Sequence, residues 1–396
     1  MAGRNAQILI AADYFLPGFR GGGPIRTLAN LIDHLGADFD FTVITRDHDL
    51  GEEEPFFDGV GAEGGGAGRA VGKARVWYLP ARRLTMGNLR GLLRSLPHDL
   101  LYLNSFFSVP FAIKLLLLRR LGAIPKVPVI LAPRGEFSAG ALAISPVKKI
   151  CYLAAVKMSG MCRDITWQAS SHFEEQDIRR IFGDRASVVV APDLPAVARP
   201  NVGAPRRLEK MPGELRVLFL SRISPMKNLD GLLLMLNGMT EPIQLHIYGP
   251  VEDLAYWEKC RTIIQELPSN VMVEYQGAVA HGVVAQIFAE HDLFFFPTHG
   301  ENFGHVILES LTAGCPVLIS DQTPWSALEE NGAGWAFPLN RPEFFQQALR
   351  ECVALGAAEY RDFRKRAQGF ARLALQDEHT LQANQGMFAL ALQRGR

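Results

Sequence analysis

The chain has 396 residues, of which 48% are hydrophobic and 21% charged, and its formal net charge is zero. This length and composition are typical of an α/β protein with two domains, each large enough to form its own core. The sequence has no run of about 18 uncharged apolar residues, and its start leads directly into a strand pattern without signal-peptide features. We therefore expect neither a membrane-spanning helix nor a secretion signal.

The zero net charge hides an asymmetry between the two halves of the chain. Residues 1–200 hold 24 basic and 19 acidic side chains, whereas the remainder holds 17 and 22. Much of the basic surplus lies within residues 101–160, where eight Lys or Arg side chains accompany one acid, Glu136. This pattern indicates a negatively charged partner on that side of the first half.

Five cysteines are scattered along the sequence, namely Cys151, Cys162, Cys260, Cys315 and Cys352. Their number is odd, and none of them form a Cys-x-x-Cys pair. The sequence therefore favours a reducing, cytoplasmic environment and argues against a disulfide framework or a zinc site.

Short apolar runs alternate with helical patterns through most of the chain. In the first half we expect strands at residues 8–12, 41–45, 100–103, 128–131, 165–168 and 188–190. The pattern restarts in the second half, with expected strands at residues 215–220, 244–248, 271–275, 293–296 and 317–320. Strands separated by helices predict parallel sheets covered on both faces. The predicted fold class is therefore α/β, with two Rossmann-like domains.

The domain boundaries follow from a change of pattern near the middle of the chain. We expect a first domain at 1–195, a Pro- and Arg-rich hinge at 196–213, a second domain at 214–375 and a C-terminal helix at 376–396. Residues 357–396 show an amphipathic helical pattern throughout.

A glycine-rich stretch at residues 51–68 is expected to be a mobile loop. A phosphate-binding role for its glycines is the alternative, although no strand-to-helix context surrounds them.

The first expected strand is followed by the glycine loop at residues 17–24, which contains Gly22 and Gly23. Glycines there let backbone N–H groups approach a ligand closely, and a helix that begins near Pro24 directs its positive end toward the same place. The spacing is not Gly-x-Gly-x-x-Gly, so it is weak evidence for a dinucleotide. A plain tight turn is the alternative.

Two further segments of the first half contain ionisable groups. Asp47-His48-Asp49 imitates an Asp-x-Asp metal site, but we expect these residues to be exposed to solvent and not to bind metal. Arg134 and Glu136 lie in a turn that follows the strand at 128–131. Both are candidate site residues, and the alternative for Arg134 is a turn residue packed over the edge of the sheet.

In the second half, Arg222 and Lys227 follow the strand at 215–220, just before a helix. Two cations at the C-terminal end of a strand are placed to neutralise a diphosphate. A solvated basic loop is the alternative.

Two carboxylates, Glu301 and Glu309, flank the junction between a loop and a helix. The strand at 293–296 precedes this loop, and Gly314-Cys315-Pro316 ends the helix. The free N–H groups at the helix start, at Asn302, Phe303 and Gly304, favour a phosphate or sugar oxygen. Each carboxylate can accept hydrogen bonds from a pair of hydroxyls. The alternative is a purely structural pair of carboxylates.

The spacing of Glu301 and Glu309 resembles the Glu-x7-Glu signature of the retaining glycosyltransferases of family 4, which have the GT-B fold. The flanking residues are also similar, namely Pro297-Thr298 before the motif and Gly314-x-Pro316 with the strand after it. Arg222 and Lys227 resemble the Arg-x4-Lys element of the family, residues 21–23 its glycine loop, and residues 133–135 the Pro-Arg-Gly segment of a subgroup.

The resemblance implies a role for each of these residues. Glu301 would bind the hydroxyls of the donor sugar, and Glu309 the ribose. Arg222 and Lys227 would stabilise the diphosphate, with Gly22 and Gly23 facing the donor phosphates. Many relatives place a histidine near residues 132–137, so Arg134 is the candidate for contact with the transferred sugar and Glu136 the weaker one.

The resemblance further implies a retaining, metal-independent hexosyltransferase with no cofactor, which moves a sugar from a nucleoside diphosphate sugar to an acceptor hydroxyl. Two domains would face each other across a cleft, with the C-terminal helix crossing back to the first domain. Thr323-Pro324-Trp325 resembles a subgroup found in bacterial polysaccharide assembly, so a glycan or lipid-linked acceptor is expected.

The alternatives are a non-catalytic sugar-nucleotide-binding protein of the same fold and an NAD(P)-dependent enzyme. The Rossmann glycine fingerprint and ribose acid required by the latter are missing.

A peripheral contact with an anionic membrane is a further expectation for residues 101–160. The segments 111–121 and 147–157 both mix apolar stretches with basic residues. The alternative is that both are helices covering the sheet, and the leucine run at 115–118 favours burial. The expected location is the cytoplasm, with possible attachment to the inner face of the cell membrane. We expect no nucleic acid partner.

Overall fold

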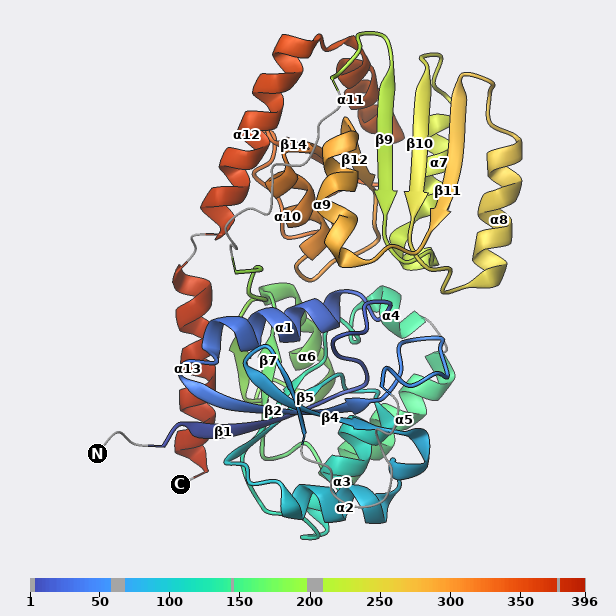
Figure 1. The fold of residues 1–396 in the computed structure, drawn as a ribbon. Helices are drawn as coiled ribbons and strands as arrows, with labels where there is room; N and C mark the ends of the chain where they lie inside the picture. Colours follow the sequence, from blue (N-terminus) through green and yellow to red (C-terminus); the bar gives the residue numbers. More distant parts are fainter. Residues whose placement is uncertain (1–3, 58–67, 144–145, 198–208, 376–377, 396) are drawn as a thin grey trace. The chain divides into compact units, whose positions relative to one another are not determined.

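The structure, a computed structural model, describes residues 4–57, 68–143, 146–197, 209–375 and 378–395. The chain divides into two compact units: residues 1–197 with 378–396, and residues 198–377 (Figure 1). The glycine-rich residues 58–67 and most of the expected hinge lie outside the described residues.

The first unit is built on a sheet of eight described strands in the order β3-β4-β2-β1-β5-β6-β7-β8. Every neighbouring pair is parallel except the hairpin of β3 and β4. The strands are β1 (Ala6–Ala12), β2 (Phe39–Arg46), β3 (Arg69–Val71), β4 (Ala74–Leu79), β5 (Leu100–Asn104), β6 (Val129–Ala132), β7 (Ile165–Ala169) and β8 (Val188–Val190).

The six strands expected in the first half are confirmed, with ends that differ by one or two residues. The hairpin of β3 and β4 was missed. Its antiparallel register pairs Val71 with Ala74 across the two residues Gly72 and Lys73, and Gly72 has a φ of 57°. A two-residue turn with glycine in the left-handed region is a recognisable hairpin signal.

Helices cover both faces of this sheet. Side chains of α1 and α13 join one buried cluster, and side chains of α2, α3, α5 and α6 join the cluster on the other face. The helices are α1 (Gly23–Leu35), α2 (Met86–Ser95), α3 (Lys114–Arg120), α4 (Ala139–Ala143), α5 (Pro146–Ser159), α6 (His172–Phe182) and α13 (Glu378–Arg394), with the short turns η1 (Ala81–Arg83) and η2 (Val109–Ile113).

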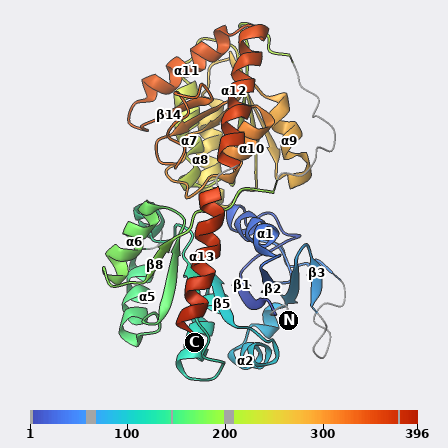
Figure 2. The ribbon, with the colours of Figure 1, turned by 90° about the vertical axis from the view of Figure 1, so that its left-hand side faces the viewer.

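The C-terminal helix α13 completes the core of the first unit (Figure 2). Phe388 is fully buried, with its ring centroid 5.2 Å from that of Phe39 and 5.8 Å from that of Tyr102. Asn384 Nδ2 donates to the carbonyl of Pro192 at 2.8 Å. The expected return of the C-terminal helix to the first domain is therefore confirmed.

The amphipathic pattern over residues 357–396 covers two helices that belong to different units. Residues 357–375 form a separate helix, α12, which packs on α10 in the second unit. Tyr360 of α12 is buried there and donates its hydroxyl to the carbonyl of Asp292 at 2.7 Å. Amphipathic periodicity alone does not show which core a helix covers.

The second unit contains a parallel sheet of six described strands in the order β11-β10-β9-β12-β13-β14. The strands are β9 (Leu215–Leu220), β10 (Ile243–Tyr248), β11 (Val271–Gly277), β12 (Leu293–Phe296), β13 (Val317–Ser320) and β14 (Gly334–Phe337). The five strands expected here are confirmed. The edge strand β14 was missed because its four residues begin with a glycine and show no clear alternation.

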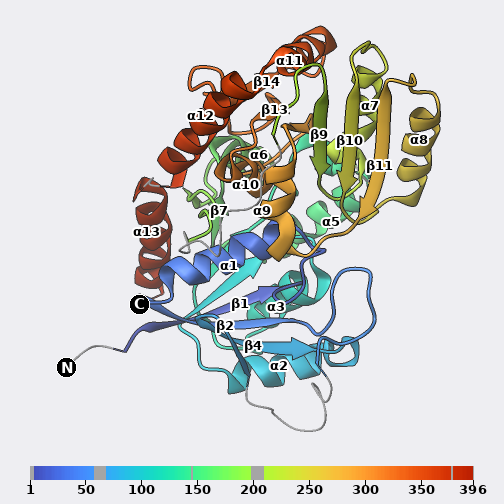
Figure 3. The same cartoon turned by 45° about the horizontal axis from the view of Figure 1, so that its top comes forward.

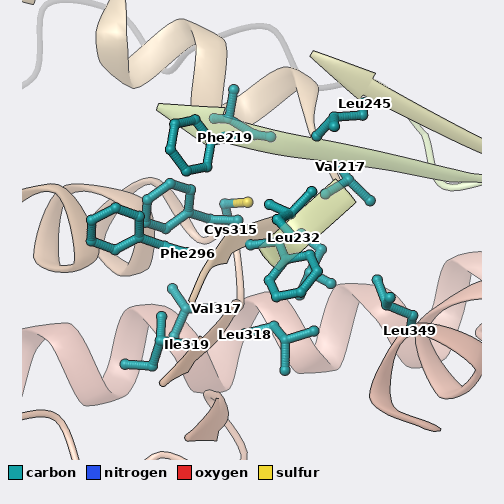
Figure 4. Packing of buried hydrophobic residues seen from close by; sticks show 14 of the residues in the cluster. Val217, Phe219, Leu232, Leu245, Phe296, Cys315, Val317, Leu318, Ile319 and Leu349 are labelled. Atoms are coloured by element: carbon teal, nitrogen blue, oxygen red, sulfur yellow. The ribbon is translucent and has the colours of Figure 1, made fainter. Parts of the chain in front are cut away.

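Helices lie on both faces of the second sheet as well (Figure 3). They are η3 (Pro225–Lys227), α7 (Leu229–Leu236), α8 (Leu254–Gln265), α9 (His281–Glu290), α10 (His305–Ala313), α11 (Pro342–Ala354) and α12 (Ala357–Leu375). One buried cluster joins them to the strands, and Figure 4 shows Phe219 and Phe296 near Cys315 within it. Among the helices that the structure describes, none combines the length and apolar character needed to cross a membrane.

The burial of Phe388 generates a stability prediction. Phe388→Ala should destabilise the first unit by about 3–5 kcal/mol, because it removes an aromatic ring from a close-packed core. Hydrogen exchange of β1 and β2 measures the loss of protection. Leu390→Ala on the same helix, where Leu390 is 37% exposed, serves as the control and should cost much less. Unchanged protection of β1 and β2 in Phe388→Ala would contradict this role of α13.

Candidate functional site

The order of strands in the second unit reverses direction between β9 and β12. β9 lies between β10 and β12, so the connections that leave β9 and β12 at their carboxyl ends run to opposite sides. Ligands of open parallel sheets bind outside the carboxyl ends of strands at such a reversal. The segment after β9 carries Arg222 and Lys227, and the loop after β12 carries Glu301.

Hydrogen bonds join these two segments. The carbonyl of Met226 accepts from the amide of His299 at 2.9 Å and from the hydroxyl of Thr298 at 3.0 Å. Asn228, whose φ is 57°, donates its side-chain amide to the carbonyl of Pro297 at 2.8 Å. The segments are therefore held at a fixed distance from each other, which orients the charged side chains that they carry.

Lys227 and Glu301 form an ion pair between these two hydrogen-bonded segments. Their side chains are only 11% and 19% exposed, and Lys227 Nζ also lies 5.7 Å from the centroid of the Phe296 ring. Lys227 ends the short helical turn η3 and is largely buried, so the alternative of a solvated loop does not apply to it. Removing either partner would leave the other charge partly buried without compensation.

Arg222 lies in a more open position. Its Nη1 pairs with Glu252 Oε1 at 2.6 Å, and the two side chains are 30% and 38% exposed. Ion pairs of this exposure contribute little to stability, so the guanidinium can exchange partners at low cost.

The backbone beside Arg222 depends on a glycine. Gly249 has a φ of 138°, and a Cβ at that position would lie 1.8 Å from the carbonyl oxygen of Ser221. Only a glycine allows the chain after β10 to pass this close to the chain after β9. The position of Arg222 therefore depends on Gly249.

The start of α10 is fixed by contacts outside the helix. Gly304, with a φ of 76°, is its N-cap, and the helix has no side-chain cap and no acidic residue in its first turn. The indole of Trp325 donates to the carbonyl of Phe303 at 2.5 Å. The amide of Glu301 donates to the carbonyl of Gln322 at 3.0 Å. Asn302, Phe303 and Gly304 thus lead into a helix N-terminus whose dipole favours an anion.

Glu309 lies in the second turn of α10, and its side chain is 27% exposed. Its Oε1 is 3.7 Å from Nδ1 of His281, the first residue of α9. The second carboxylate of the motif therefore lies toward the start of α9, whereas Glu301 pairs with Lys227.

The first unit has an equivalent reversal of strand order, between β1 and β5. The glycine loop follows β1, and Gly22, with a φ of 70°, caps α1 without a side-chain hydrogen bond. Asp49 Oδ2 accepts from the amides of Phe19 and Arg20 in that loop, at 2.8 and 3.1 Å.

The expectation that Asp47-His48-Asp49 is exposed to solvent is wrong. Asp47 and Asp49 are 7% and 2% exposed, because Asp49 organises the glycine loop and Asp47 Oδ1 hydrogen-bonds to His48 Nδ1 at 2.8 Å. In the part of the chain that the structure describes, no group of three or more His, Cys, Asp or Glu residues is arranged to hold a metal ion.

Arg134 is directed into the first unit. Its backbone has a φ of 56°, and its side chain is 6% exposed. Nε donates to Asn104 Oδ1 at 2.8 Å, Nη2 donates to the Tyr102 hydroxyl at 2.5 Å, and Nη1 pairs with Asp193. This guanidinium joins β5, β6 and the chain after β8, an arrangement that fits a positioning role. Its contact with a sugar stays a prediction.

Glu136 organises the neighbouring loop. One carboxylate oxygen accepts from the Ser105 hydroxyl at 2.6 Å, and the other accepts from the amides of Phe106 and Phe107 at 2.6 and 3.1 Å. Burial raises the pKa of Glu136 from its ordinary 4.5 to about 7, although these hydrogen bonds act in the opposite direction.

Sequence reasoning missed Glu174 and Asp193. The carboxylate of Glu174 accepts from the amides of Gly135 and Ser170, at 2.6 and 2.7 Å, and so fixes the turn after Arg134. The spacing of Ser171 and Glu174 is that of a capping box, a signal that could have identified this residue. Asp193 has no comparable local signal, because its partner Arg134 is distant in sequence.

Solved structures with this architecture cover nearly the whole chain. Sucrose-phosphate synthase from Thermosynechococcus elongatus aligns over 98% of this chain and 99% of its own, with a TM-score of 0.71 and 16% identity. HepE from Anabaena, in complex with UDP and glucose, aligns over 98% and 99%, with a TM-score of 0.66 and 15% identity. WaaG, a glycosyltransferase involved in lipopolysaccharide biosynthesis, aligns over 96% and 98%, with a TM-score of 0.64 and 14% identity. The chain therefore has the GT-B fold, with two Rossmann-like domains and a C-terminal helix that packs in the first.

The second unit contains the sequence match. Residues 204–370 match the family described as glycosyl transferases group 1. Over 112 residues, or 27% of this chain, the sequence is 29% identical to the O-antigen chain mannosyltransferase B of Escherichia coli. That stretch spans 28% of the length of the curated relative.

The raised pKa of Glu136 generates a prediction for stability against pH. The folded protein holds this proton more tightly than the unfolded chain, so the associated stability is fully present below about pH 4.5 and is lost as the pH rises through about 7. Glu136→Gln should remove up to about 3 kcal/mol of this pH dependence, since the amide does not ionise.

Urea unfolding at a series of pH values between 4.5 and 8 measures the effect as a difference between variant and wild type. Glu53→Gln, on an exposed loop, is the matched control. A Glu136→Gln curve that runs parallel to the wild-type curve would contradict the assignment.

Proposed function

We propose that this protein is a retaining glycosyltransferase that moves a hexose from a nucleoside diphosphate sugar to an acceptor hydroxyl. The observation that carries the proposal is the pair of hydrogen-bonded segments after β9 and β12, where the strand order of the second unit reverses. It brings Arg222, Lys227 and Glu301 to one edge of the sheet, within the part of the chain that matches the family. Cations, a helix N-terminus and a hydroxyl-binding carboxylate are together the groups that a sugar nucleotide requires.

The donor binds to the second unit in this proposal. Arg222 and Lys227 stabilise the diphosphate, and the amides at Asn302, Phe303 and Gly304 add the positive end of α10. Glu301 binds the hydroxyls of the transferred sugar, and Glu309 binds the ribose. A UDP sugar is the proposed donor, because the structure of HepE contains UDP and glucose.

The ion pair between Lys227 and Glu301 has a specific part in this mechanism. It holds the ammonium and the carboxylate in place before the donor arrives, so little reorganisation is needed when the diphosphate binds. The diphosphate then shares Lys227 with Glu301, and Glu301 turns its second oxygen toward the sugar. Arg222 leaves its exposed partner Glu252 for the departing diphosphate at low cost.

The first unit takes the acceptor in this proposal, and Gly22 and Gly23, at the N-terminus of α1, are proposed phosphate-binding residues. Arg134 contributes by positioning the loop after β6 or by contact with the transferred sugar. The proposed acceptor is a lipid-linked glycan in bacterial polysaccharide assembly, as the similarity to an O-antigen mannosyltransferase supports. Such an acceptor would be met on the inner face of the cell membrane.

Incubation with a panel of UDP and GDP sugars and a lipid-linked acceptor tests the proposal directly. Release of the nucleoside diphosphate with formation of a glycosylated product of retained anomeric configuration is the expected result. Thermal stabilisation by UDP or GDP without turnover would instead identify a non-catalytic binding protein, and stabilisation by NADH would sink the sugar-nucleotide assignment.

Substitution of the two cations should affect activity and stability differently. Arg222→Ala should lower kcat/KM on the order of 100-fold or more with little change in melting temperature, because its ion pair is exposed. Lys227→Ala should lower kcat/KM at least as much and also reduce the melting temperature, since it leaves Glu301 partly buried without its partner. Steady-state kinetics and thermal unfolding measure the two effects.

Lys365→Ala is the control for loss of an exposed paired cation, since Lys365 is 77% exposed and pairs with Asp362. Kinetics like those of the wild type in either site variant would refute the diphosphate assignment.

Activity should survive a chelator, because cationic side chains and helix amides supply the positive charge for the leaving group. The rate of transfer in EDTA should stay within a factor of about two of the rate without it, whereas a metal-dependent enzyme would lose nearly all activity. A collapse of the rate in EDTA that Mn²⁺ or Mg²⁺ reverses would show that a metal ion takes part.

A further inference from the structure

Helix α5 (Pro146–Ser159) has apolar side chains on two opposite sides. On the inner side, Val156 is buried, and Tyr152 and Leu153 pack against the core of the first unit. On the outer side, Val147, Ile150 and Met158 are 74%, 65% and 81% exposed, and Cys151 and Ala154 are exposed as well. We call these five exposed residues the outer stripe of α5. At about 100° per residue, the five residues fall within a sector of about 100° on one face of the helix.

Lysines border the outer stripe on both sides. At 3.6 residues per turn, Lys148 and Lys157 lie about 90° to either side of the centre of the stripe. Both are exposed, and the sequence of α5 contains no acidic residue. An apolar stripe bordered by lysines is the pattern of a helix that lies in the plane of a membrane surface, with its apolar side chains among the acyl chains and its charges at the headgroups.

The other basic and apolar segment of the region 101–160 presents a smaller apolar surface. In α3 (Lys114–Arg120), Leu115, Leu116 and Leu118 are at most 4% exposed and cover the sheet, whereas Leu117 and the following Leu121 are 38% and 68% exposed. Arg119 Nε donates to the carbonyl of Val127 at 3.1 Å. Two exposed leucines one turn apart offer less apolar surface than the outer stripe of α5, so the proposal is made for α5, and membrane contact of residues 111–121 stays a prediction.

Lys149 is also excluded from this surface. Its ammonium donates to the carbonyl of Ala141 at 2.5 Å and lies 5.2 Å from the centroid of the Phe107 ring. The two lysines that border the stripe are thus Lys148 and Lys157, a distinction that the sequence alone does not make.

We propose that the outer stripe of α5 docks this protein on an anionic lipid membrane. The stripe extends over about 17 Å along the helix, at 1.5 Å per residue. Helix α5 packs on the face of the first sheet opposite to the one that α13 covers. The choice of a membrane as partner rests on the proposed function for its lipid-linked acceptor. The surface itself is argued from α5 alone.

The charges of α5 favour an anionic membrane over a second copy of the chain as the partner of the outer stripe. A two-fold contact through the outer stripe would bring the lysines of both copies together with no acidic residue of α5 to compensate them, which is unfavourable. Anionic headgroups supply the opposite charge, and each lysine near them strengthens attachment about five-fold.

Flotation with vesicles tests the proposal. The wild-type protein should bind phosphatidylglycerol vesicles at low salt, bind phosphatidylcholine vesicles weakly, and dissociate as salt is added. Lys148→Glu with Lys157→Glu should weaken binding roughly 30-fold or more, because two attractive charges become repulsive. Ile150→Asp should weaken it as well, through loss of the apolar contact.

Lys126→Glu with Arg90→Glu is the matched control. Both residues are exposed on the first unit outside α5, so the pair changes the net charge equally. Equal loss of binding in the two double variants would overturn the assignment to α5. No binding of the wild type to anionic vesicles at low salt would overturn the docking itself, and a dimer abolished by Ile150→Asp would then point to a second copy.

Cys151 supplies a probe within the stripe. It is the exposed cysteine, whereas Cys260, Cys315 and Cys352 are buried and burial raises the pKa of the partly buried Cys162 thiol to about 12. A polarity-sensitive dye attached to Cys151 should shift its emission to the blue on anionic vesicles, since the stripe enters the apolar layer. An unchanged emission from bound protein would contradict insertion of this face.

Failure of docking and failure of the proposed function give different results. UDP binding by the second unit, measured without vesicles, should be the same in wild type and in Lys148→Glu with Lys157→Glu. Vesicle binding without any nucleotide binding would support the docking surface and refute the sugar-transfer proposal, and nucleotide binding without vesicle binding would do the reverse.

Discussion

The arrangement of this protein depends on parallel strands that are buried on both faces. A parallel sheet needs helices as connections, so every strand ends at the same edge, and the chain must leave the sheet there. Where the strand order reverses, two of these exits diverge and leave room for a ligand. In the second unit, the segments that follow β9 and β12 carry Arg222, Lys227 and Glu301. In the first unit, the glycine loop follows β1, and Ser105 follows β5.

Both edges keep their loops in place with hydrogen bonds to carbonyl or carboxylate oxygens. In the second unit the carbonyl of Met226 accepts from Thr298 and His299. In the first unit carboxylates take that part, since Asp49, Glu136 and Glu174 each accept from backbone amides of neighbouring loops. A carboxylate that accepts several amides holds a loop firmly but requires burial of an ionisable group. Burial raises the pKa of Glu136 toward neutrality for that reason.

The two units therefore use charge in different ways. Arg134 is a cation whose hydrogen bonds go to other residues of the first unit, and its left-handed backbone is maintained by those contacts. Arg222 forms an exposed ion pair with Glu252 and can exchange this partner at low cost. The exposure of Lys227 lies between that of Arg134 and that of Arg222. The surface of α5 adds a third use, because its lysines have no acidic neighbour on their own helix.

The sequence by itself determined the fold class and predicted the family match of the second half. Apolar runs predicted eleven of the strands, and the motif around Glu301 and Glu309 predicted the match that residues 204–370 confirm. Periodicity and short motifs are local, so they are visible without coordinates.

Only the tertiary structure decided which charges meet: the pairing of Lys227 with Glu301 spans 74 positions, and that of Arg134 with Asp193 spans 59. It also buried Asp47 and Asp49 and left one side of α5 exposed. These outcomes depend on which surfaces pack against each other, and an amphipathic or charged pattern is compatible with several partners until the chain folds.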